Sequence, residues 1–405
     1  YKEVALQHEA SEVEVPGELI VKFQRGSGRQ NREAALARVA ARMQHFKDRN
    51  IGPKDWRPLV VFDQLVHVKL KPGLDLKEVI AELERDPSVE YAEPNFVVNA
   101  LDNFPNDPDL NLLWGLQNNG QTDGTAGADI DAPAAWDTST GSAEVVVAVI
   151  DTGIDYAHPD LIPNMWVNTD EIPQNGIDDD DNGFVDDVYG YDVYNDDADP
   201  KDDHFHGTHC AGTIGAAGDN GIGVAGVNWT VRMMAVKFLS ASGSGDTAGA
   251  VSAIQYAINN GAHVMSNSWG GSGYSQALQD VILDAHEAGI VFVAAAGNNG
   301  NNSLVYPAAY DEVIAVSATD HNDVKAGFSS YGTFVDVAAP GVNIFSTKLN
   351  GTYGYASGTS MACPHVSGLA ALLKSQDTSL TPHQVEHLLE TTTDDLGDSG
   401  WDTFY

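Results

Sequence analysis

The feature that most limits what this chain can fold into is a set of short, nearly continuous apolar runs in its second half. Five such runs occupy residues 145–150, 231–238, 262–265, 290–296 and 313–316. Stretches with helical spacing separate them, including residues 246–259 and 275–288. Strands that helices cover on both faces read as such runs, whereas half-exposed strands alternate apolar with polar residues. The sequence therefore predicts an α/β fold with a mostly parallel sheet, whose ligands gather at the carboxyl ends of the strands.

The first hundred residues follow a different pattern, in which short strands alternate with two helices. The expected strands are residues 18–23, 59–62, 66–71 and 89–98, and the expected helices are residues 31–49 and 76–85. Asp75 is placed to cap the second helix, and Asp86-Pro87 ends it. The order β-α-β-β-α-β predicts a small α+β domain of the ferredoxin-like kind.

Charge divides the chain at the same place. Residues 1–101 carry 15 basic and 16 acidic side chains, whereas residues 102–405 carry 6 basic and 42 acidic ones. The acidic part would repel nucleic-acid phosphates and anionic membranes, so neither is an expected partner. No window is long and apolar enough to predict a membrane span, and the polar residues 1–10 do not resemble a signal peptide. Such a surface suits a calcium-rich or salty extracellular medium, because cations screen its self-repulsion.

Three residues that can act together in nucleophilic catalysis each occur within two residues of a glycine. Asp151 follows the apolar run 145–150, His206 opens HGTH at an expected helix start, and Ser360 lies in GTSMA before another helix. A serine hydroxyl is a weak nucleophile until an imidazole accepts its proton, and the imidazole needs a carboxylate to orient it. A serine at a helix start also has free backbone N–H groups that suit a developing oxyanion. Each motif alone is more often structural, but Asp, His, Ser is a known order for such a triad.

The surrounding sequences carry a family resemblance. DTGID (151–155), HGTHCAG (206–212) and GTSMACPHV (358–366) resemble the three signatures of the subtilase family, and AAAGN (294–298) resembles the stretch with its oxyanion asparagine. The resemblance covers residues 17–405. It implies a subtilisin-like three-layer fold and a serine endopeptidase in which Ser360 is the nucleophile, His206 the general base and Asp151 the orienting carboxylate. The Asn298 side chain and the Ser360 backbone N–H would hold the oxyanion.

The resemblance also implies how substrate is bound. Two segments would clamp an extended peptide as a strand between two edges. Their residues are Gly243, Ser244 and Gly245 on one side and Ser268, Trp269 and Gly270 on the other. Val305 would lie at the base of the pocket for the residue before the cut, and we expect it to narrow that pocket.

For the first domain, the resemblance implies a propeptide that assists folding and inhibits the enzyme. Residues 1–16 would be an N-terminal extension, residues 17–101 the propeptide and residues 102–405 the catalytic domain. The family pattern puts the processing cut near Leu101 and Asp102, with the tail before it filling the site as a product. We therefore expect a secreted, monomeric, self-processed zymogen whose substrates are proteins and peptides.

An acidic insert at residues 168–203 predicts a cation site. An EF-hand-like loop would have Asp178, Asp180, Asn182, Gly183 and Asp186 at positions 1, 3, 5, 6 and 9. This spacing of oxygen ligands suits Ca²⁺. Position 12 is Tyr189, so Asp187 or Asp192 would have to supply the last carboxylate. A solvated acidic loop without an ion is the alternative.

The resemblance implies a second calcium site, so we expect at least two. Its ligands would be Gly218, Asn220, Ile222 and Val224 in one loop, with Asp160 and Asp109 from elsewhere. That loop also contains GIGVAG (221–226), which fits a dinucleotide-binding pattern. The pattern needs a strand before it and a helix after it, and here the expected order is the reverse.

One alternative function stays open at this point. A permanently blocked pseudoprotease could act as a calcium-dependent binding module, although all four catalytic positions are intact. The only cysteines are Cys210 and Cys363. We expect two small buried thiols there rather than a disulfide.

Overall fold

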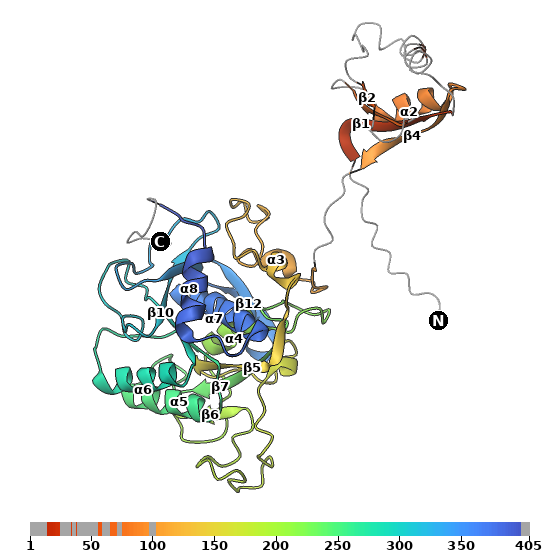
Figure 1. Ribbon diagram of the computed structural model, residues 1–405. Coiled ribbons are helices and arrows are strands. Elements are labelled where there is room, and N and C mark those ends of the chain that lie inside the picture. The colour runs from red at the N-terminus through yellow and green to blue at the C-terminus, as the bar shows by residue number, and fades with distance from the viewer. Residues whose placement is uncertain are drawn as a thin grey trace. The chain divides into compact units, whose positions relative to one another are not determined.

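The structure is a computed structural model that describes residues 14–24, 34, 38, 56–58, 65–70, 75–96 and 103–397. The chain divides into two compact units, residues 1–101 and residues 102–405 (Figure 1). Each unit has its own sheet and its own hydrophobic core.

The first unit is built on a four-stranded antiparallel sheet with the order β2-β3-β1-β4. Its strands are β1 (Glu14–Phe23), β2 (Trp56–Pro58), β3 (Leu65–Lys69) and β4 (Val89–Phe96). Helix α2 (Leu76–Glu84) packs on this sheet, and the Asp75 carboxylate caps it, as predicted. A sheet in which β1 lies between β3 and β4 is the predicted ferredoxin-like arrangement.

Part of that prediction lies outside the described residues, namely the strand at residues 59–62 and most of the helix at residues 31–49. Arg38, within the range of that helix, reaches the turn after α2, where its Nε lies 3.0 Å from Asp86 Oδ2. The Asp86 side chain is fully buried, and this bond holds its pKa well below the usual range.

The second unit contains a seven-stranded sheet with the order β11-β10-β9-β8-β5-β7-β6, in which every neighbouring pair is parallel. Its strands are β5 (Gly141–Asp151), β6 (Gly190–Asp192), β7 (Thr230–Lys237), β8 (Val264–Asn267), β9 (Val291–Ala295), β10 (Ile314–Thr319) and β11 (Val337–Pro340). The predicted parallel sheet is confirmed, and the five apolar runs form its centre. The short edge strands β6 and β11 were not predicted.

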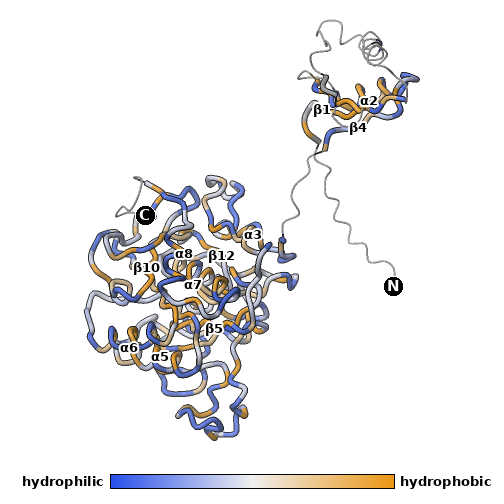
Figure 2. The backbone as a smooth tube through the Cα atoms, viewed as in Figure 1, coloured by the Kyte–Doolittle hydropathy of each residue, from blue (hydrophilic) through white to orange (hydrophobic). Residues whose placement is uncertain are grey.

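Helices cover both faces of this sheet. They are α4 (His206–Gly215) and α7 (Thr359–Gln376) on one face, and α5 (Thr247–Asn259) and α6 (Gln276–Glu287) on the other. Because successive strand side chains alternate, Val147 and Val149 enter the core under α4 and α7, whereas Ala148 and Ile150 enter the core under α5 and α6. Figure 2 shows hydrophobic segments concentrated in the sheet and in the helices that cover it.

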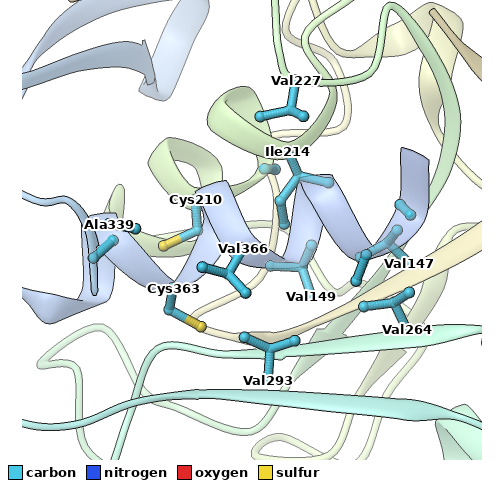
Figure 3. Packing of buried hydrophobic residues seen from close by; sticks show 14 of the residues in the cluster. Val147, Val149, Cys210, Ile214, Val227, Val264, Val293, Ala339, Cys363 and Val366 are labelled. Atoms are coloured by element: carbon cyan, nitrogen blue, oxygen red, sulfur yellow. The ribbon is translucent and has the colours of Figure 1, made fainter. Parts of the chain in front are cut away.

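The packing between α4 and α7 decides where the functional side chains lie. Figure 3 shows Cys210 and Ile214 of α4 in the same core as Cys363 and Val366 of α7, next to Val149 of β5. Both cysteines are buried free thiols, as predicted. Since α4 and α7 start at the same edge of the sheet, their first turns come together there.

A hairpin of β12 (Ile344–Lys348) and β13 (Thr352–Ala356) leads into α7 and packs on α4. The other helices are α3 (Ala132–Trp136), α8 (Pro382–Thr392) and short 3₁₀ turns at Leu110–Leu112, Ile162–Asn164 and Leu349–Gly351. Within the described ranges, no helix has both the length and the apolar character needed to cross a membrane.

Candidate active site

The three residues singled out for catalysis come together at the carboxyl edge of the parallel sheet. Asp151 is the last residue of β5, His206 is the first of α4, and Ser360 is the second of α7. His206 Nδ1 lies 2.8 Å from Asp151 Oδ1 and 3.0 Å from Oδ2. Asp151 is completely buried, and its Oδ1 also accepts from Thr152 N at 2.7 Å. This arrangement fixes the orientation of the imidazole, as a triad requires.

Two opposing influences act on the His206 imidazole. Burial is the largest single influence, and by itself it lowers the pKa of His206. The charge of Asp151, its hydrogen bond and the charge of Asp202 act in the opposite direction and outweigh burial. The pKa of His206 is therefore raised above its ordinary value.

Ser360 lies beside this pair. Its carbonyl accepts from Cys210 Sγ at 3.3 Å, and that sulfur lies within 4.8 Å of the nearest ligand atoms of both Asp151 and His206. Ser360 Oγ donates to the Ser268 carbonyl at 3.1 Å, and no Ser360–His206 hydrogen bond is present in the described part of the chain. Catalytic hydrogen bonds are often long in ligand-free enzymes, and a rotation about the Ser360 Cα–Cβ bond redirects the hydroxyl.

Asn298 and the backbone of Ser360 face one small space. Asn298 Oδ1 accepts from Thr359 N at 2.9 Å and from Thr359 Oγ1 at 3.1 Å, which leaves the Nδ2 donor for another acceptor. A Cβ built on Gly358 would lie 3.5 Å from Asn298 Nδ2 and 3.6 Å from Ser360 N. A glycine at position 358 thus keeps open a point that two N–H donors can reach.

A buried carboxylate that sequence reasoning missed ties these parts together. The partners of Asp202 are Thr152 Oγ1 (2.9 Å), His204 N (2.8 Å), Phe205 N (3.0 Å), Thr208 N (2.9 Å) and Thr208 Oγ1 (2.6 Å). Asp202 thereby joins the residue after Asp151 to the first turn of α4, which begins with His206. Phe205, with φ of 101°, has a left-handed backbone that bulky residues rarely adopt, and the Asp202 bond supports this turn.

One predicted clamp segment directly adjoins Ser360. Ser268 follows β8, and its Oγ donates to the Ser360 carbonyl at 2.9 Å. A Cβ on Gly270 or on Gly297 would lie 2.8 or 2.9 Å from a Val305 methyl group. Val305, which is 5% exposed, therefore lies between this segment and the loop that carries Asn298.

The other predicted clamp segment, residues 243–245, is exposed and follows a tight turn. Ser240 N donates to the Ser244 carbonyl at 2.9 Å, and Gly243 has a φ of 71°. Gly245 lies so close to the chain after β7 that a Cβ there would be 2.6 Å from the Phe238 carbonyl. Phe238 also meets Trp269 of the first segment, with ring centroids 4.8 Å apart, so the two clamp segments share a wall.

The acidic insert gathers three carboxylates in one place. Oxygen atoms of Glu171, Asp178 and Asp180 lie within 4.8 Å of one another. Asp178 and Asp180 also accept from the backbone N of Asn182, at 3.1 and 3.0 Å. Gly183, with φ of 94°, allows the turn that follows. Sequence reasoning missed Glu171, because it precedes the EF-hand-like spacing.

Asp187 and Asp192, the two candidates for the last carboxylate of the EF-hand-like loop, differ in position. Asp187 is completely buried, and its partners are Asn168 Nδ2 (2.9 Å), Asn182 Nδ2 (3.2 Å) and Tyr256 Oη (2.6 Å). Asp180 Oδ2 accepts from the same two amides, so Asp180 and Asp187 are neighbours. Asp192 bonds to Asn195, and Asp186 accepts from the backbone of the turn at residues 175–176.

The second predicted calcium loop closes around Asp160. This buried carboxylate accepts from Asn220 Nδ2 (2.7 Å), Val224 N (2.9 Å) and Tyr353 Oη (3.1 Å). Burial raises the pKa of Asp160. The loop lies between α4 and β7, so the glycine pattern within it follows a helix and precedes a strand, as predicted.

The segment before α3 reaches the same loop. Asp109 N donates to the Gly223 carbonyl at 2.9 Å. Asp107 is 4% exposed; its Oδ2 accepts from Asp219 N at 2.7 Å, and its Oδ1 has no hydrogen-bond partner among the residues described. A buried carboxylate oxygen is costly to leave without a partner, and a cation would satisfy it.

Comparisons with known proteins agree with this architecture. The Subtilase family matches residues 142–405, and the Fervidolysin N-terminal prodomain matches residues 3–95. The Thermophilic serine proteinase of Bacillus sp. (strain AK1) is 38% identical over 98% of this chain and 87% of its own length. Thermitase of Thermoactinomyces vulgaris is 41% identical over 67% of this chain and 88% of its own length.

Among solved structures, the crystal structure of a cold adapted subtilisin-like serine proteinase matches with a TM-score of 0.53 and 34% identity. The match covers 64% of this chain and 85% of that one. The family match spans more than half of the chain, and its range contains the residues that meet at the sheet edge. The chain therefore belongs to the subtilase family of subtilisin-type serine proteases and carries an N-terminal prodomain.

Proposed function

We propose that residues 102–405 are a secreted endopeptidase in which Asp151, His206 and Ser360 form the catalytic triad. The single observation that carries this proposal is the 2.8 Å contact between Asp151 Oδ1 and His206 Nδ1 beside Ser360. The buried carboxylate and the bond to Nδ1 leave Nε2 of the imidazole as the atom that can accept a proton from Ser360 Oγ.

The chemical steps then follow from the positions of the donors and acceptors. Ser360 Oγ attacks the scissile carbonyl carbon while its proton passes to His206 Nε2. The oxyanion that forms accepts hydrogen bonds from Asn298 Nδ2 and Ser360 N. His206 next gives the proton to the leaving amine, and an acyl enzyme remains on Ser360. Water, deprotonated by His206, releases the acid by the same steps.

Substrate selection rests on the two clamp segments. An extended peptide would pair with residues 243–245 and 268–270, and Ser268 of the second segment contacts Ser360. The contacts of Val305 with the segments at Gly270 and Gly297 support its role as the base of the first pocket. Because valine fills space there, medium-sized apolar residues before the cut are the expected substrates.

For the prodomain we propose inhibition followed by self-cleavage between Leu101 and Asp102. The division into two compact units falls at this bond, and the two units differ in charge composition. The pseudoprotease alternative predicts that this bond stays intact.

We propose two calcium sites. Glu171, Asp178 and Asp180 would supply the oxygen ligands that Ca²⁺ prefers in the insert, and Asp187, which shares two amide donors with Asp180, would add a further carboxylate. Asp160, Asn220 and the backbone of residues 218–224 would form the second site. Asp107 suits it better than Asp109, because a buried Asp107 oxygen has no other partner in the described ranges. Calcium would supply no step of the hydrolysis; it would neutralise clustered carboxylates and hold the two loops.

A fluorophosphonate probe tests the catalytic proposal, because it reacts with an activated serine and releases fluoride. The processed enzyme should be labelled on Ser360, as peptide mapping by mass spectrometry would show, and lose peptide hydrolysis. Ser360→Ala and His206→Ala should remain unlabelled, while Ser357→Ala, three residues from the nucleophile, should be labelled normally. Labelling of another serine, or hydrolysis that survives Ser360→Ala, would contradict the proposal.

A further inference from the structure

Lys348 lies against Phe205, the residue before His206, and it has no carboxylate partner among the residues that the structure describes. Lys348 Nζ donates to the Tyr355 carbonyl at 3.2 Å and lies 4.7 Å from the centroid of the Phe205 ring. Its stem crosses Gly354, where a Cβ would be 3.1 Å from Lys348 Cε. Within the described part of the chain, no carboxylate forms an ion pair with it, although acidic residues outnumber basic ones seven to one in residues 102–405.

The neighbours of Lys348 connect it to the catalytic site. Phe205 immediately precedes His206, and its ring stacks on that of His204 with centroids 4.9 Å apart. The His204 ring lies 6.3 Å from the His206 ring, and its Nε2 would be 3.5 Å from a Cβ on Gly243. The side chains of Lys348, Phe205 and His204 therefore form a continuous wall that passes the catalytic imidazole and ends at one clamp segment.

This wall indicates which part of the substrate meets Lys348. A peptide that enters along residues 243–245 and is cut at Ser360 has its residues before the cut on the His204 side. The residues after the cut continue past His206, away from Gly243. The hairpin β12–β13, which carries Lys348 and leads into α7, packs on α4, the helix that begins with His206.

We propose that Lys348 binds a side-chain carboxylate in the leaving half of the substrate, within the first three residues after the cut. This inference rests on the proposed function and names the substrate class that it favours. The amine is already held by Tyr355 O and the Phe205 ring, so little side-chain freedom remains to be lost on binding. The proposed processing bond agrees with it, because Asp102 would be the first residue after that cut.

The net charge of the enzyme makes this preference easy to recognise. A unit with 6 basic and 42 acidic residues should on average repel an acidic peptide and attract a basic one. A preference for Asp over Asn and Lys at one position after the cut therefore requires a local cation. At a partly exposed site, such a contact changes the rate about three- to fivefold.

The test uses peptides with one common acyl half and amidated C-termini, with Asp, Asn or Lys at the first, second or third position after the cut. We expect kcat/KM of the processed enzyme to favour Asp over Asn about three- to fivefold at one position. Lys348→Gln should bring this ratio close to one, and Lys348→Arg should restore it. The control Arg232→Gln removes an equal charge near the amino end of β7, where Arg232 Nη1 donates to the Pro163 carbonyl, and should keep the ratio.

The outcomes separate this inference from the proposed function. An enzyme that cuts every peptide but shows no Asp preference overturns the inference and leaves the catalytic proposal intact. The inference is also overturned if the Asp-to-Asn ratio of kcat/KM is unchanged in Lys348→Gln, or if it falls equally in Arg232→Gln. An enzyme that cuts no peptide at all contradicts the proposed function instead.

Discussion

At the residue scale, His206 is influenced by two carboxylates that act in different ways. Asp151 bonds directly to Nδ1 and orients the ring. Asp202 does not touch the ring, but it holds the first turn of α4 through Phe205 N and Thr208 N and adds a charge that raises the His206 pKa. We interpret Asp202 as a positioning residue for the proposed triad.

Asp202→Asn should lower kcat/KM about 10- to 100-fold, because the amide cannot accept all five bonds and the imidazole shifts. It should also move the acid limb of the pH–rate profile to lower pH. His206 must be neutral to accept a proton, so activity falls as the pH drops through its raised pKa; without the Asp202 charge that pKa decreases. A pH profile of kcat/KM checks this. The exposed Asp199→Asn, which removes one charge from the same loop, is the control, and an unmoved acid limb in Asp202→Asn would contradict the account.

The oxyanion donors give a second prediction at this scale. Asn298→Ala should lower kcat about 100- to 1000-fold with little change in KM, because the lost bond forms mainly in the transition state. The neighbouring Asn299→Ala should stay close to the parent enzyme. Steady-state kinetics on one peptide substrate measure both; a loss confined to KM would show that Asn298 binds the ground state instead.

At the element scale, the hairpin β12–β13 can approach helix α4 closely because residue 212 is a glycine. A Cβ on Gly212 of α4 would lie 2.2 Å from Thr347 Oγ1 and 2.4 Å from Ser346 Oγ. These two hydroxyls also donate to the carbonyls of Thr208 and His209 in α4. The hairpin carries the chain into Ser360, so this contact sets the position of the proposed nucleophile.

Gly212→Ala should lower the free energy of unfolding by about 1–3 kcal/mol, because β12 must move away from α4. Gly249→Ala is the matched control: it lies in the first turn of α5, where the nearest atom to a Cβ is 3.4 Å away, and should be neutral or stabilising by up to about 1 kcal/mol. Urea denaturation in a Ser360→Ala background, which prevents self-digestion, compares the two. Equal midpoints would contradict the packing argument.

The elements differ in how far local sequence predicts them. The central strands β5, β7, β8, β9 and β10 are visible as apolar runs because helices cover both their faces. The edge strands β6 and β11 have three and four residues, and they become strands only by pairing with β7 and β10. Helix α8 has a readable start, since Thr381 and Gln384 form a capping box.

The residues of the site also differ in how far local sequence identifies them. The triad and Asn298 stand in distinctive local motifs, so the sequence identifies them as candidates. Asp202, Glu171 and Asp107 have no such motif, and their roles arise from partners that the fold brings to them. Asp107, for example, meets Asp219 across 112 positions of sequence.

At the scale of the whole molecule, the acidic charge of residues 102–405 makes bound cations the main expected stabiliser. We expect removal of calcium with a chelator to lower the unfolding temperature by about 5–10 °C, and calcium, but not an equal ionic strength of NaCl, to restore it. Differential scanning fluorimetry of Ser360→Ala measures this without self-digestion.

The same measurement distinguishes the two candidate acids near the second loop. Asp107→Asn should reduce the rise in unfolding temperature that calcium causes, because the buried Oδ1 of Asp107 would bind the ion. Asp109→Asn should retain this rise. The opposite pattern would assign the ligand to Asp109. A full gain in both variants would show that neither side chain binds calcium at this site.

The central claim is that Ser360 of this chain, activated by His206 and Asp151, cuts peptide bonds and first cuts its own. Intact-mass analysis of the purified chain in calcium, comparing the parent protein with Ser360→Ala, tests it most directly. We expect the parent to separate into two fragments near Leu101–Asp102 while Ser360→Ala remains one chain. If neither protein separates and the parent cleaves no added peptide, the claim is contradicted and the blocked binding module becomes the better account.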